Sequence, residues 1–376
     1  MGSPLLTARG LAMRLAETAI ERDRRGGLPK VERDLVRASG LLTLTIPARF
    51  GGADQPLSVM LDVVREIARV DPSIAHVLAF HHLMLASVRL YGSEAQWSRA
   101  YGEAAEQGLF WGNALNPKDT RTVTRVDGTR VRFDGTKSFC SGAGDSDRLL
   151  VSAHDADSQK LVVAMIPTAR PGVRVLGDWD AMGQRQTDSG TVVLDDVEVH
   201  ADELLRTPGP MGSVFASLRS CIAQSILVHV YLGIAEGAFE AVRAGCMGPS
   251  TPLDPIGALR GGELYLELES ASLLAARARG ALDAAWARGD DLTASERGET
   301  AIAIALAKAG TTKAGLAVTT RMFELLGARS TLREPALDRY FRNLRTHTLH
   351  DPVDTKLREL GAYALTDALP VPGFYG

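Results

Sequence analysis

The sequence predicts an α+β protein built from three consecutive regions. Apolar residues recur at helical spacing through residues 5–105, short β-type segments follow from about 109 to 200, and long apolar helical stretches follow from about 212. This order differs from the alternating strand–helix pattern of a parallel doubly wound sheet, and no Gly-x-Gly-x-x-Gly or Walker-type sequence is present. We therefore expect an N-terminal α-helical domain over 1–108, a central β-barrel or sandwich domain over 109–205 and a C-terminal long-helix bundle over 206–376.

Turn residues divide the first two regions into elements. Asp71-Pro72 separates two helical segments, because aspartate and proline commonly open a helix. Asp127-Gly128 stands between the two alternating segments of "TVTRVDGTRVRF", which predicts a β-hairpin. "RLLVSA", "KLVVAMIP" and "GTVVLDDVEVH" then read as further strands.

Composition excludes several classes of function. The 376 residues are 45% hydrophobic and 23% charged with a net charge of −3, which gives no reason to expect nucleic acid or an anionic membrane as a partner. Cys140, Cys221 and Cys246 form no Cys-x-x-Cys pair, so we expect a reduced, cytoplasmic environment. The N-terminus becomes charged too soon for a signal peptide, and we expect no apolar run that approaches the roughly 20 residues of a membrane span.

The segment "RTHTLHDP", residues 345–352, carries two histidines beside a helix-start signal. Asp351 is expected to cap free backbone N–H groups of a helix that has Pro352 at its first position. A metal site at His347 and His350 would need further ligands and a helical segment, so we expect no metal here. A buried neutral histidine that moves a proton near pH 7 is the better interpretation.

Two other stretches have ordinary structural interpretations when each is taken alone. His81 and His82 interrupt an apolar helix, and neighbours point about 100° apart, which predicts one surface histidine and one core histidine. Asn113 and Asn116 in "FWGNALNPKDT" suit turns, although an amide can also bind the edge of a heterocycle.

In "DGTKSFCSGAGDSD" a strand is expected to end at Phe139-Cys140-Ser141 and to enter a loop rich in glycine and serine. Such a loop allows the backbone to approach a ligand closely. Cys140 has no basic or histidine neighbour in the sequence that would lower its pKa, so it is not expected to be a nucleophile.

Taken together, the α–β–α order and three long motifs resemble one family over nearly the whole chain. The motifs are "DGTKSFCSGAGDSD", "DWDAMGQRQTDSGTVVLDDVEV" and "RNLRTHTLHDPVDTKLRELG". They are similar to the acyl-CoA dehydrogenase superfamily, and within it to the flavin-dependent monooxygenases of the dibenzothiophene monooxygenase type. The resemblance implies the acyl-CoA dehydrogenase-like fold and a homotetramer.

The resemblance also implies a two-component reaction. A separate NAD(P)H:flavin reductase supplies reduced flavin, FMNH2 or FADH2, which reacts with O2 to a C4a-hydroperoxyflavin that oxygenates a small aromatic or heteroaromatic substrate. Relatives carry a longer connection with several arginines between the first two C-terminal helices, where this chain offers only Arg243 and Arg260. The choice between FMN and FAD and the identity of the substrate therefore stay open.

Residue roles are carried over from the same resemblance. The residues expected to bind the flavin are Asn113, Phe139, Cys140, Ser141, Trp179, Ser189 and Arg329, with Ser141 near N5 of the ring. The residues expected to take part in catalysis are His350, which moves a proton, Ser141, Asn113 and His81 in the substrate pocket.

Two alternative functions remain beside the monooxygenase. Acyl-CoA dehydrogenases place a glutamate in their last helical region, commonly within Tyr-Glu-Gly, whereas this chain has "RTHTLHDP" with Asp351 already explained by capping. This difference favours oxygen chemistry over a true acyl-CoA dehydrogenase. A non-catalytic flavin-binding protein that keeps the fold is the second alternative.

Overall fold

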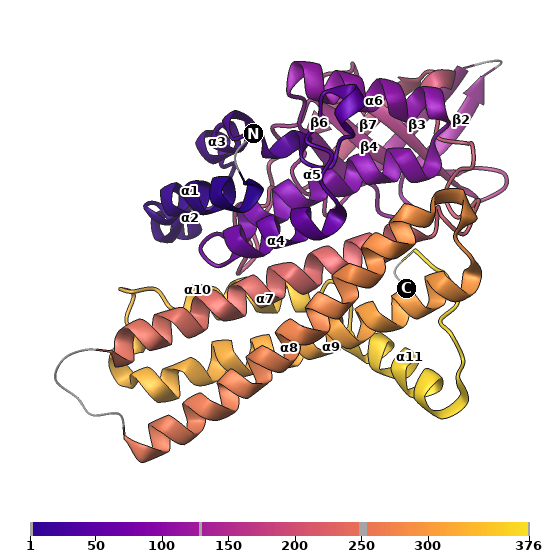
Figure 1. The fold of residues 1–376 in the computed structure, drawn as a ribbon. Helices are drawn as coiled ribbons and strands as arrows, with labels where there is room; N and C mark the ends of the chain where they lie inside the picture. The colour runs from indigo at the N-terminus through magenta and orange to yellow at the C-terminus, as the bar shows by residue number, and fades with distance from the viewer. Residues whose placement is uncertain (1–2, 128–129, 248–253, 375–376) are drawn as a thin grey trace.

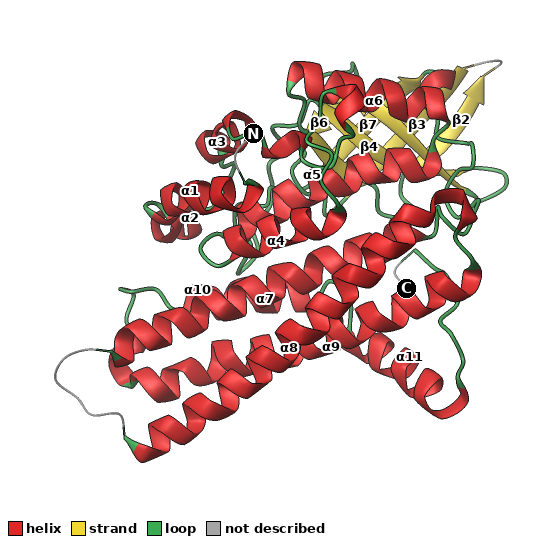
Figure 2. Cartoon of the chain, viewed as in Figure 1, coloured by secondary structure: helices red, strands yellow, loops and turns green. Residues whose placement is uncertain are grey.

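The computed structural model describes residues 3–127, 130–247 and 254–374. Short helices come first in the chain, strands follow, and long helices form the last part (Figure 1). Figure 2 shows the strands gathered on one side of the molecule, with the long helices crossing below them. The predicted α+β class and the order of its three regions are confirmed.

The N-terminal region consists of short helices packed around α4 and α5. Their bounds are α1 (Pro4–Ala16), α2 (Ala19–Arg25), α3 (Lys30–Ala38), η1 (Leu41–Thr43), η2 (Ala48–Phe50), α4 (Leu57–Ala68), α5 (Pro72–Tyr91) and α6 (Glu94–Gln107). The side chain of Asp71 accepts a hydrogen bond from the backbone N–H of Ile74 at 3.0 Å, and Pro72 opens α5. The predicted helix start is therefore confirmed.

The central region is one mixed sheet. Its strands are β1 (Trp111–Ala114), β2 (Val123–Asp127), β3 (Arg130–Lys137), β4 (Arg148–Asp155), β5 (Leu161–Pro167), β6 (Val173–Val175) and β7 (Val192–Val199). Strands β2 and β3 are antiparallel, with Asp127 opposite Arg130, as the predicted hairpin requires. Gly128 itself lies outside the described residues. Buried Phe133, Leu149 and Val197 contribute to a separate apolar core for the sheet.

Two loops at one edge of the sheet are tied to each other. The loop after β3 contains Phe139, Cys140 and Ser141, and the loop between β6 and β7 contains Thr187 and Ser189. The backbone N–H of Cys140 donates to the carbonyl of Gly190 at 3.0 Å, and that of Gly142 donates to the carbonyl of Thr187 at 2.9 Å. These bonds hold the hydroxyls of both loops in one place.

Long helices form the C-terminal region. Their bounds are α7 (Leu218–Cys246), α8 (Pro255–Arg288), α9 (Ala294–Leu326), α10 (Asp338–Thr348) and α11 (Val353–Thr366), with the short turns η3 (Ala201–Glu203), η4 (Gly289–Asp291) and η5 (Ala328–Thr331) between elements. Helix α7 packs directly on α4, because Gly233 and Gly237 of α7 carry no side chain and leave room for the backbone of α4. A Cβ atom at Gly233 would lie 2.4 Å from the carbonyl oxygen of Arg65, and one at Gly237 would lie 2.1 Å from that of Arg69.

Three helices correct our expectation about long apolar runs. By length and composition, Pro72–Tyr91, Leu218–Cys246 and Ala294–Leu326 could each cross a membrane. However, 94%, 94% and 72% of their most apolar stretches are buried inside the protein. Their buried apolar residues therefore contribute to the hydrophobic core of the protein.

The Asp351-Pro352 signal is half confirmed. Helix α11 does begin directly after Pro352, at Val353. Asp351 does not cap it, because no side-chain cap bond is formed there and its carboxylate accepts a hydrogen bond from Gln224 Nε2 at 2.8 Å. Asp351 is 5% exposed, so the residue that we expected to cap the helix is instead a buried carboxylate bonded to Gln224.

Candidate active site

A cavity of about 440 Å³ lies where α5, α7 and the two tied loops meet. The turn after α10 closes one side, and Phe374 contributes from the C-terminal segment. The residues predicted for the site that line this cavity are Asn113, Phe139, Ser141, Trp179, Ser189 and His350.

A hydrogen-bond chain runs through Ser141. Its Oγ lies 2.9 Å from His76 Nε2 and 2.8 Å from Ser189 Oγ. Ser189 Oγ lies 2.8 Å from Thr187 Oγ1, which lies 3.0 Å from the carbonyl oxygen of Gln184. Each hydroxyl has one hydrogen to donate, and a carbonyl oxygen only accepts.

The carbonyl end therefore sets the direction of the whole chain. Thr187 donates to Gln184, so Ser189 must donate to Thr187 and Ser141 must donate to Ser189. The hydrogen between His76 and Ser141 then belongs to Nε2 of the imidazole. Ser141 has no further hydrogen to give, and its oxygen can serve the cavity as an acceptor.

His76 is a site residue that the sequence reasoning missed. Burial lowers the pKa of its imidazole to about 3, which agrees with a neutral ring that carries its hydrogen on Nε2. Its ring centroid lies 4.0 Å from that of Phe80 and 4.7 Å from that of His347. The Nδ1 atoms of both His76 and His347 are buried and have no hydrogen-bond partner among the described residues.

The two histidines of "RTHTLHDP" both line the cavity, but in different settings. His347 lies in the last turn of α10, is buried, and has a pKa well below its usual value because of burial and the nearby His76. His350 follows in the turn and is exposed to solvent on one side. Its partial loss of solvation in the cavity, with the Lys308 cation nearby, lowers the pKa of His350 below its usual value. Both imidazoles are therefore neutral proton acceptors at pH 7.

Phe139 and Trp179 form an aromatic wall. Phe139 has a positive φ of 58° and leaves 61% of its surface exposed, which is unusual for a large apolar side chain. Its ring meets that of Trp179 edge to face, with centroids 6.0 Å apart, and Trp179 Nε1 donates to the carbonyl of Gln184 at 2.8 Å. Asn113 is held nearby, because its backbone N–H donates to the carbonyl of Ser141 at 3.0 Å.

A polar wall on α7 was also missed from the sequence. Arg219, Ser220 and Gln224 line the cavity there, and Lys118 joins them from the loop after β1. Arg219 is 7% exposed, and its Nε donates to Ser87 Oγ at 3.0 Å. Within the described part of the chain, no Asp or Glu forms an ion pair with Arg219, and none lines the cavity. The cavity is thus cationic without a carboxylate of its own.

Cys140 does not line the cavity. Its thiol packs in the sheet core and donates to the carbonyl of Lys137 at 3.4 Å. Burial raises the pKa of this thiol to about 12, so it is an inert structural cysteine, as the sequence predicted.

His81 lies outside this cavity, so the structure does not bring it together with the other predicted site residues. Its Nδ1 accepts from the backbone N–H of Trp111 at 3.1 Å, and its Nε2 donates to the carbonyl of Leu42 at 2.8 Å. His82 is also buried and bonds Leu41 and Thr45, which corrects the expectation of one surface histidine. The cavity face of α5 instead carries His76, Phe80 and Leu83, at helical spacing.

The three arginines considered from the sequence, Arg243, Arg260 and Arg329, lie away from this cavity. Arg329 is exposed in η5 and is absent from the cavity lining. Arg260, on α8, pairs with Glu324 on α9 at 3.5 Å. Arg243, near the end of α7, lines a groove against α4 and α8. Within one chain, none of these three arginines reaches the hydroxyls of Ser141, Thr187 and Ser189.

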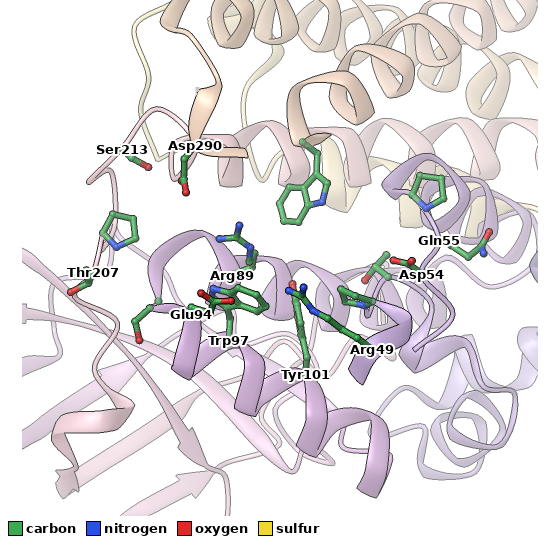
Figure 3. Close-up of a pocket in the computed structure, with 17 residues that line it drawn as sticks. Arg49, Asp54, Gln55, Arg89, Glu94, Trp97, Tyr101, Thr207, Ser213 and Asp290 are labelled. Carbon is green, nitrogen blue, oxygen red and sulfur yellow. The ribbon is translucent and has the colours of Figure 1, made fainter. Parts of the chain in front are cut away.

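A second cleft, of about 800 Å³, lies between the junction of α5 and α6 and the end of α8 (Figure 3). Arg49 and Arg89 both lie over the ring of Trp97 there, with guanidinium carbons 5.5 and 4.7 Å from its centroid. Its lining also carries acidic Asp54, Glu94 and Asp290, and it contains none of the predicted site residues. The smaller cavity is therefore the candidate active site.

The composition of this cavity fits a flavin ring and offers no metal site. Across residues 3–127, 130–247 and 254–374, no three His, Cys, Asp or Glu side chains come together to hold a metal ion. The aromatic wall of Phe139 and Trp179 suits a flat heteroaromatic ring. The acceptor oxygen of Ser141 and the polar atoms around it suit the polar edge of such a ring.

Comparison with known proteins places the chain in a family. Models of the N-terminal, middle and C-terminal domains of acyl-CoA dehydrogenase match residues 7–107, 112–197 and 225–355. The chain is 50% identical over 382 residues to a probable FMNH2-dependent monooxygenase, SfnC, of Pseudomonas putida, covering 99% of this chain and 97% of that protein.

Solved structures agree with this placement. Methanesulfinate monooxygenase MsuC from Pseudomonas fluorescens superposes with a TM-score of 0.98 at 51% identity, covering 100% of both chains. Dibenzothiophene monooxygenase TdsC from Paenibacillus sp. A11-2 gives 0.93 at 38% identity, covering 99% of both chains, and TdsC has also been solved with FMN and indole. This chain therefore belongs to the acyl-CoA dehydrogenase superfamily and, within it, to the group of FMNH2-dependent monooxygenases.

Proposed function

We propose that this protein is the oxygenase of a two-component system that uses reduced FMN and O2 to oxidise a small sulfinate. In the overall reaction, one oxygen atom of O2 becomes the third oxygen of a sulfonate. The other oxygen leaves as water with the two hydrogens of reduced FMN. A separate NAD(P)H:flavin reductase supplies the reduced FMN.

The main observation that supports an oxygenase over an acyl-CoA dehydrogenase is the composition of the cavity wall. A true acyl-CoA dehydrogenase needs a carboxylate base next to its flavin and substrate, and no Asp or Glu of the described residues lines this cavity. Neutral His76, His347 and His350 line it instead. Asp351 is the acidic residue nearest to His347 and His350 in the sequence, and its carboxylate is buried and bonded to Gln224.

FMN is the flavin that we propose, because relatives of this chain are named for it or have been solved with it. Phe139 and Trp179 would bind the ring by its faces and edges, and Ser141 and Ser189 would meet its polar edge. When bound, reduced FMN supplies the electrons that activate O2. Reduced flavin carries ring N–H groups, so an acceptor oxygen on Ser141 matches it.

The remaining chemistry falls to the histidines. His350 is the residue that we propose to transfer a proton at its imidazole during oxygen transfer, since it lines the cavity and is neutral at pH 7. His347 and His76 lie against each other in the cavity lining, with ring centroids 4.7 Å apart, and we propose that they help to keep water away from the reacting atoms. Asn113, fixed by the backbone of Ser141, is proposed to line the place where oxygen reacts.

A sulfinate is the substrate class that we propose because the cavity is cationic. Arg219 and Lys118 line it and can bind a negatively charged oxygen pair. The aromatic class implied by the sequence resemblance is the second candidate, since Phe80, Leu83 and Leu227 line the same space.

We further propose a homotetramer. Leu259, Leu266 and Leu273 recur every seven residues on α8 and are 65%, 69% and 71% exposed, which is typical of a helix face that packs on another helix. Arg329 is exposed in η5 and absent from the cavity of its own chain, so we propose that its predicted contact with flavin is made to the flavin of a neighbouring subunit.

The test is reconstitution with a flavin reductase, NADH, FMN and O2. We expect methanesulfinate to yield one methanesulfonate for each O2 consumed beyond that lost as H2O2, and we expect the His350→Ala variant to release mainly H2O2. Dibenzothiophene and indole are the matched aromatic substrates. Reduction of bound FMN by an acyl-CoA without the reductase, or binding of FMN with no product from either class, would contradict the proposal.

A further inference from the structure

Lys308 is a buried cation that lies behind the cavity rather than in its wall. We propose that Lys308 is a positioning residue for the oxygenation reaction: through the hydroxyl of Tyr231 it fixes the end of α10, and its amine lies close to the segment that carries His347 and His350. This inference rests on the proposed function of the same site. It assigns a role to a residue of α9, an element that contributes no side chain to the cavity lining.

A chain of contacts joins Lys308 to the segment with the two histidines. Lys308 Nζ donates to the hydroxyl of Tyr231 at 3.2 Å and lies 4.7 Å from the centroid of its ring. The same hydroxyl donates to the backbone carbonyl of His347 at 2.8 Å. Burial raises the pKa of Tyr231 well above its usual value, so this hydroxyl keeps its hydrogen and remains a donor.

The charges around Lys308 come from three elements. His347 lies in the last turn of α10, and His350 and Asp351 follow in the turn after it; Lys356 faces Lys308 from α11. Lys356 is itself paired with Glu359 at 3.0 Å. Burial is the largest cause that lowers the pKa of both imidazoles; the Lys308 cation adds to this effect at both, and Asp351 opposes it at His350. The balance between Lys308 and Asp351 therefore bears directly on the charge of the cavity histidines.

Packing alone does not account for a lysine at this position. Lys308 is 1% exposed, and burial lowers its pKa to about 7. Buried Lys137 is a lysine with a structural role, because its ammonium donates to the backbone carbonyls of Asn116 and Asp119 and so holds that loop. Lys308 has no such pair of carbonyl acceptors among the described residues, and a methionine of similar length would fill its space without loss of solvation.

The experiment compares Lys308→Met with Lys308→Arg, which keeps the charge, and with Lys313→Met, an exposed lysine on the same helix. The first readout is NMR titration of the histidine side chains, which requires no turnover. In Lys308→Met we expect the His350 imidazole to gain its proton about one pH unit higher than in the unchanged protein. In Lys308→Arg and Lys313→Met we expect no such shift.

The second readout is the pH profile of sulfonate formation. Its acid limb is expected to move upward by about one pH unit in Lys308→Met and to stay in place in Lys308→Arg. Tyr231→Phe keeps the cation but releases the carbonyl of His347, so we expect a kcat about tenfold lower with an unmoved acid limb.

Equal histidine titration in Lys308→Met and the unchanged protein would overturn the role of Lys308, whatever the activity. A uniform loss of rate with no movement of the acid limb would also overturn it, because it would indicate only a packing role. If the unchanged protein made no sulfonate while the titration shifted as expected, the proposed function would fail and the electrostatic role of Lys308 would stand.

Discussion

His76 Nε2 and Ser141 Oγ lie 2.9 Å apart, and this contact joins the middle of α5 to the loop after β3. It is the last step of a hydrogen-bond chain whose direction is set several elements away from His76, at the carbonyl of Gln184, which accepts from the hydroxyl of Thr187. As a consequence, the oxygen of Ser141 can only accept a hydrogen bond from a ligand. The first prediction follows from this direction of the hydrogen bond.

Ser141→Ala should weaken the binding of reduced FMN about fivefold to tenfold and leave oxidised FMN nearly unchanged, because only the reduced ring offers the extra N–H groups. Anaerobic titration of protein fluorescence with each form of FMN measures both dissociation constants. Ser146→Ala is the matched control, since Ser146 in the same loop bonds Ala143 and Thr168 and does not line the cavity. An equal loss for both redox forms would contradict the assigned direction.

Arg219→Met should raise KM for methanesulfinate about tenfold or more and change KM for indole little, because only the sulfinate carries a charge for the guanidinium to bind. Steady-state kinetics with both substrates measure the difference. Arg206→Met, at an exposed arginine outside the cavity, should leave both values unchanged. Equal effects on the charged and the neutral substrate would show that Arg219 does not select by charge.

Buried histidines should make the protein less stable in acid. Burial lowers the pKa of His229 from 6.5 to about 4, so below pH 6.5 the unfolded chain binds a proton that the folded protein does not. Stability is thus unaffected above pH 6.5 and falls as the pH drops toward 4. At pH 5 the loss from this one residue is about 2 kcal/mol.

His229→Leu should therefore remove about 2 kcal/mol of the difference in unfolding free energy between pH 7.5 and pH 5. Urea denaturation at the two pH values measures this difference. Leucine also removes an Nε2 atom that has no partner in the described structure, so stability at pH 7.5 should not fall. His200→Gln, at an exposed histidine, serves as the control, and an unchanged pH dependence in His229→Leu would refute the prediction.

Leu266→Asp should break the proposed tetramer into smaller species, because it places a charge in the middle of the exposed α8 face. Light scattering coupled to size-exclusion chromatography measures the mass. Leu6→Asp changes a leucine of α1 with a similar exposed fraction, 64%, and should leave the mass unchanged. A Leu266→Asp protein that keeps the mass of the unchanged protein would exclude this face as the contact between subunits.

Local signals in the sequence predicted the elements well. Asp71-Pro72 and the hairpin flanks needed only neighbouring residues for their interpretation, and both agree with the structure. Asp351 shows the limit of such signals. Its partner, Gln224, comes from a helix that lies 127 positions earlier in the chain, and that contact outweighs the local preference for capping.

The choice between histidines on α5 shows a second limit. His81 was favoured from the resemblance, yet His76, Phe80 and Leu83 form the face that lines the cavity. Their spacing of four and three was visible in the sequence. Which face of an almost wholly buried helix meets a cavity depends on the elements packed around it, and 94% of the most apolar part of α5 is buried.

Helix α5 holds β1 through His81 and presents His76 to the cavity, five positions apart on one rigid rod. Any substitution that slides or rotates this rod to improve its fit against the sheet will also displace the hydroxyl chain. Directed evolution for heat resistance in the N-terminal helices should therefore be screened for coupling of O2 use to product from the first round. Variants chosen on melting temperature alone would accumulate leakage to H2O2.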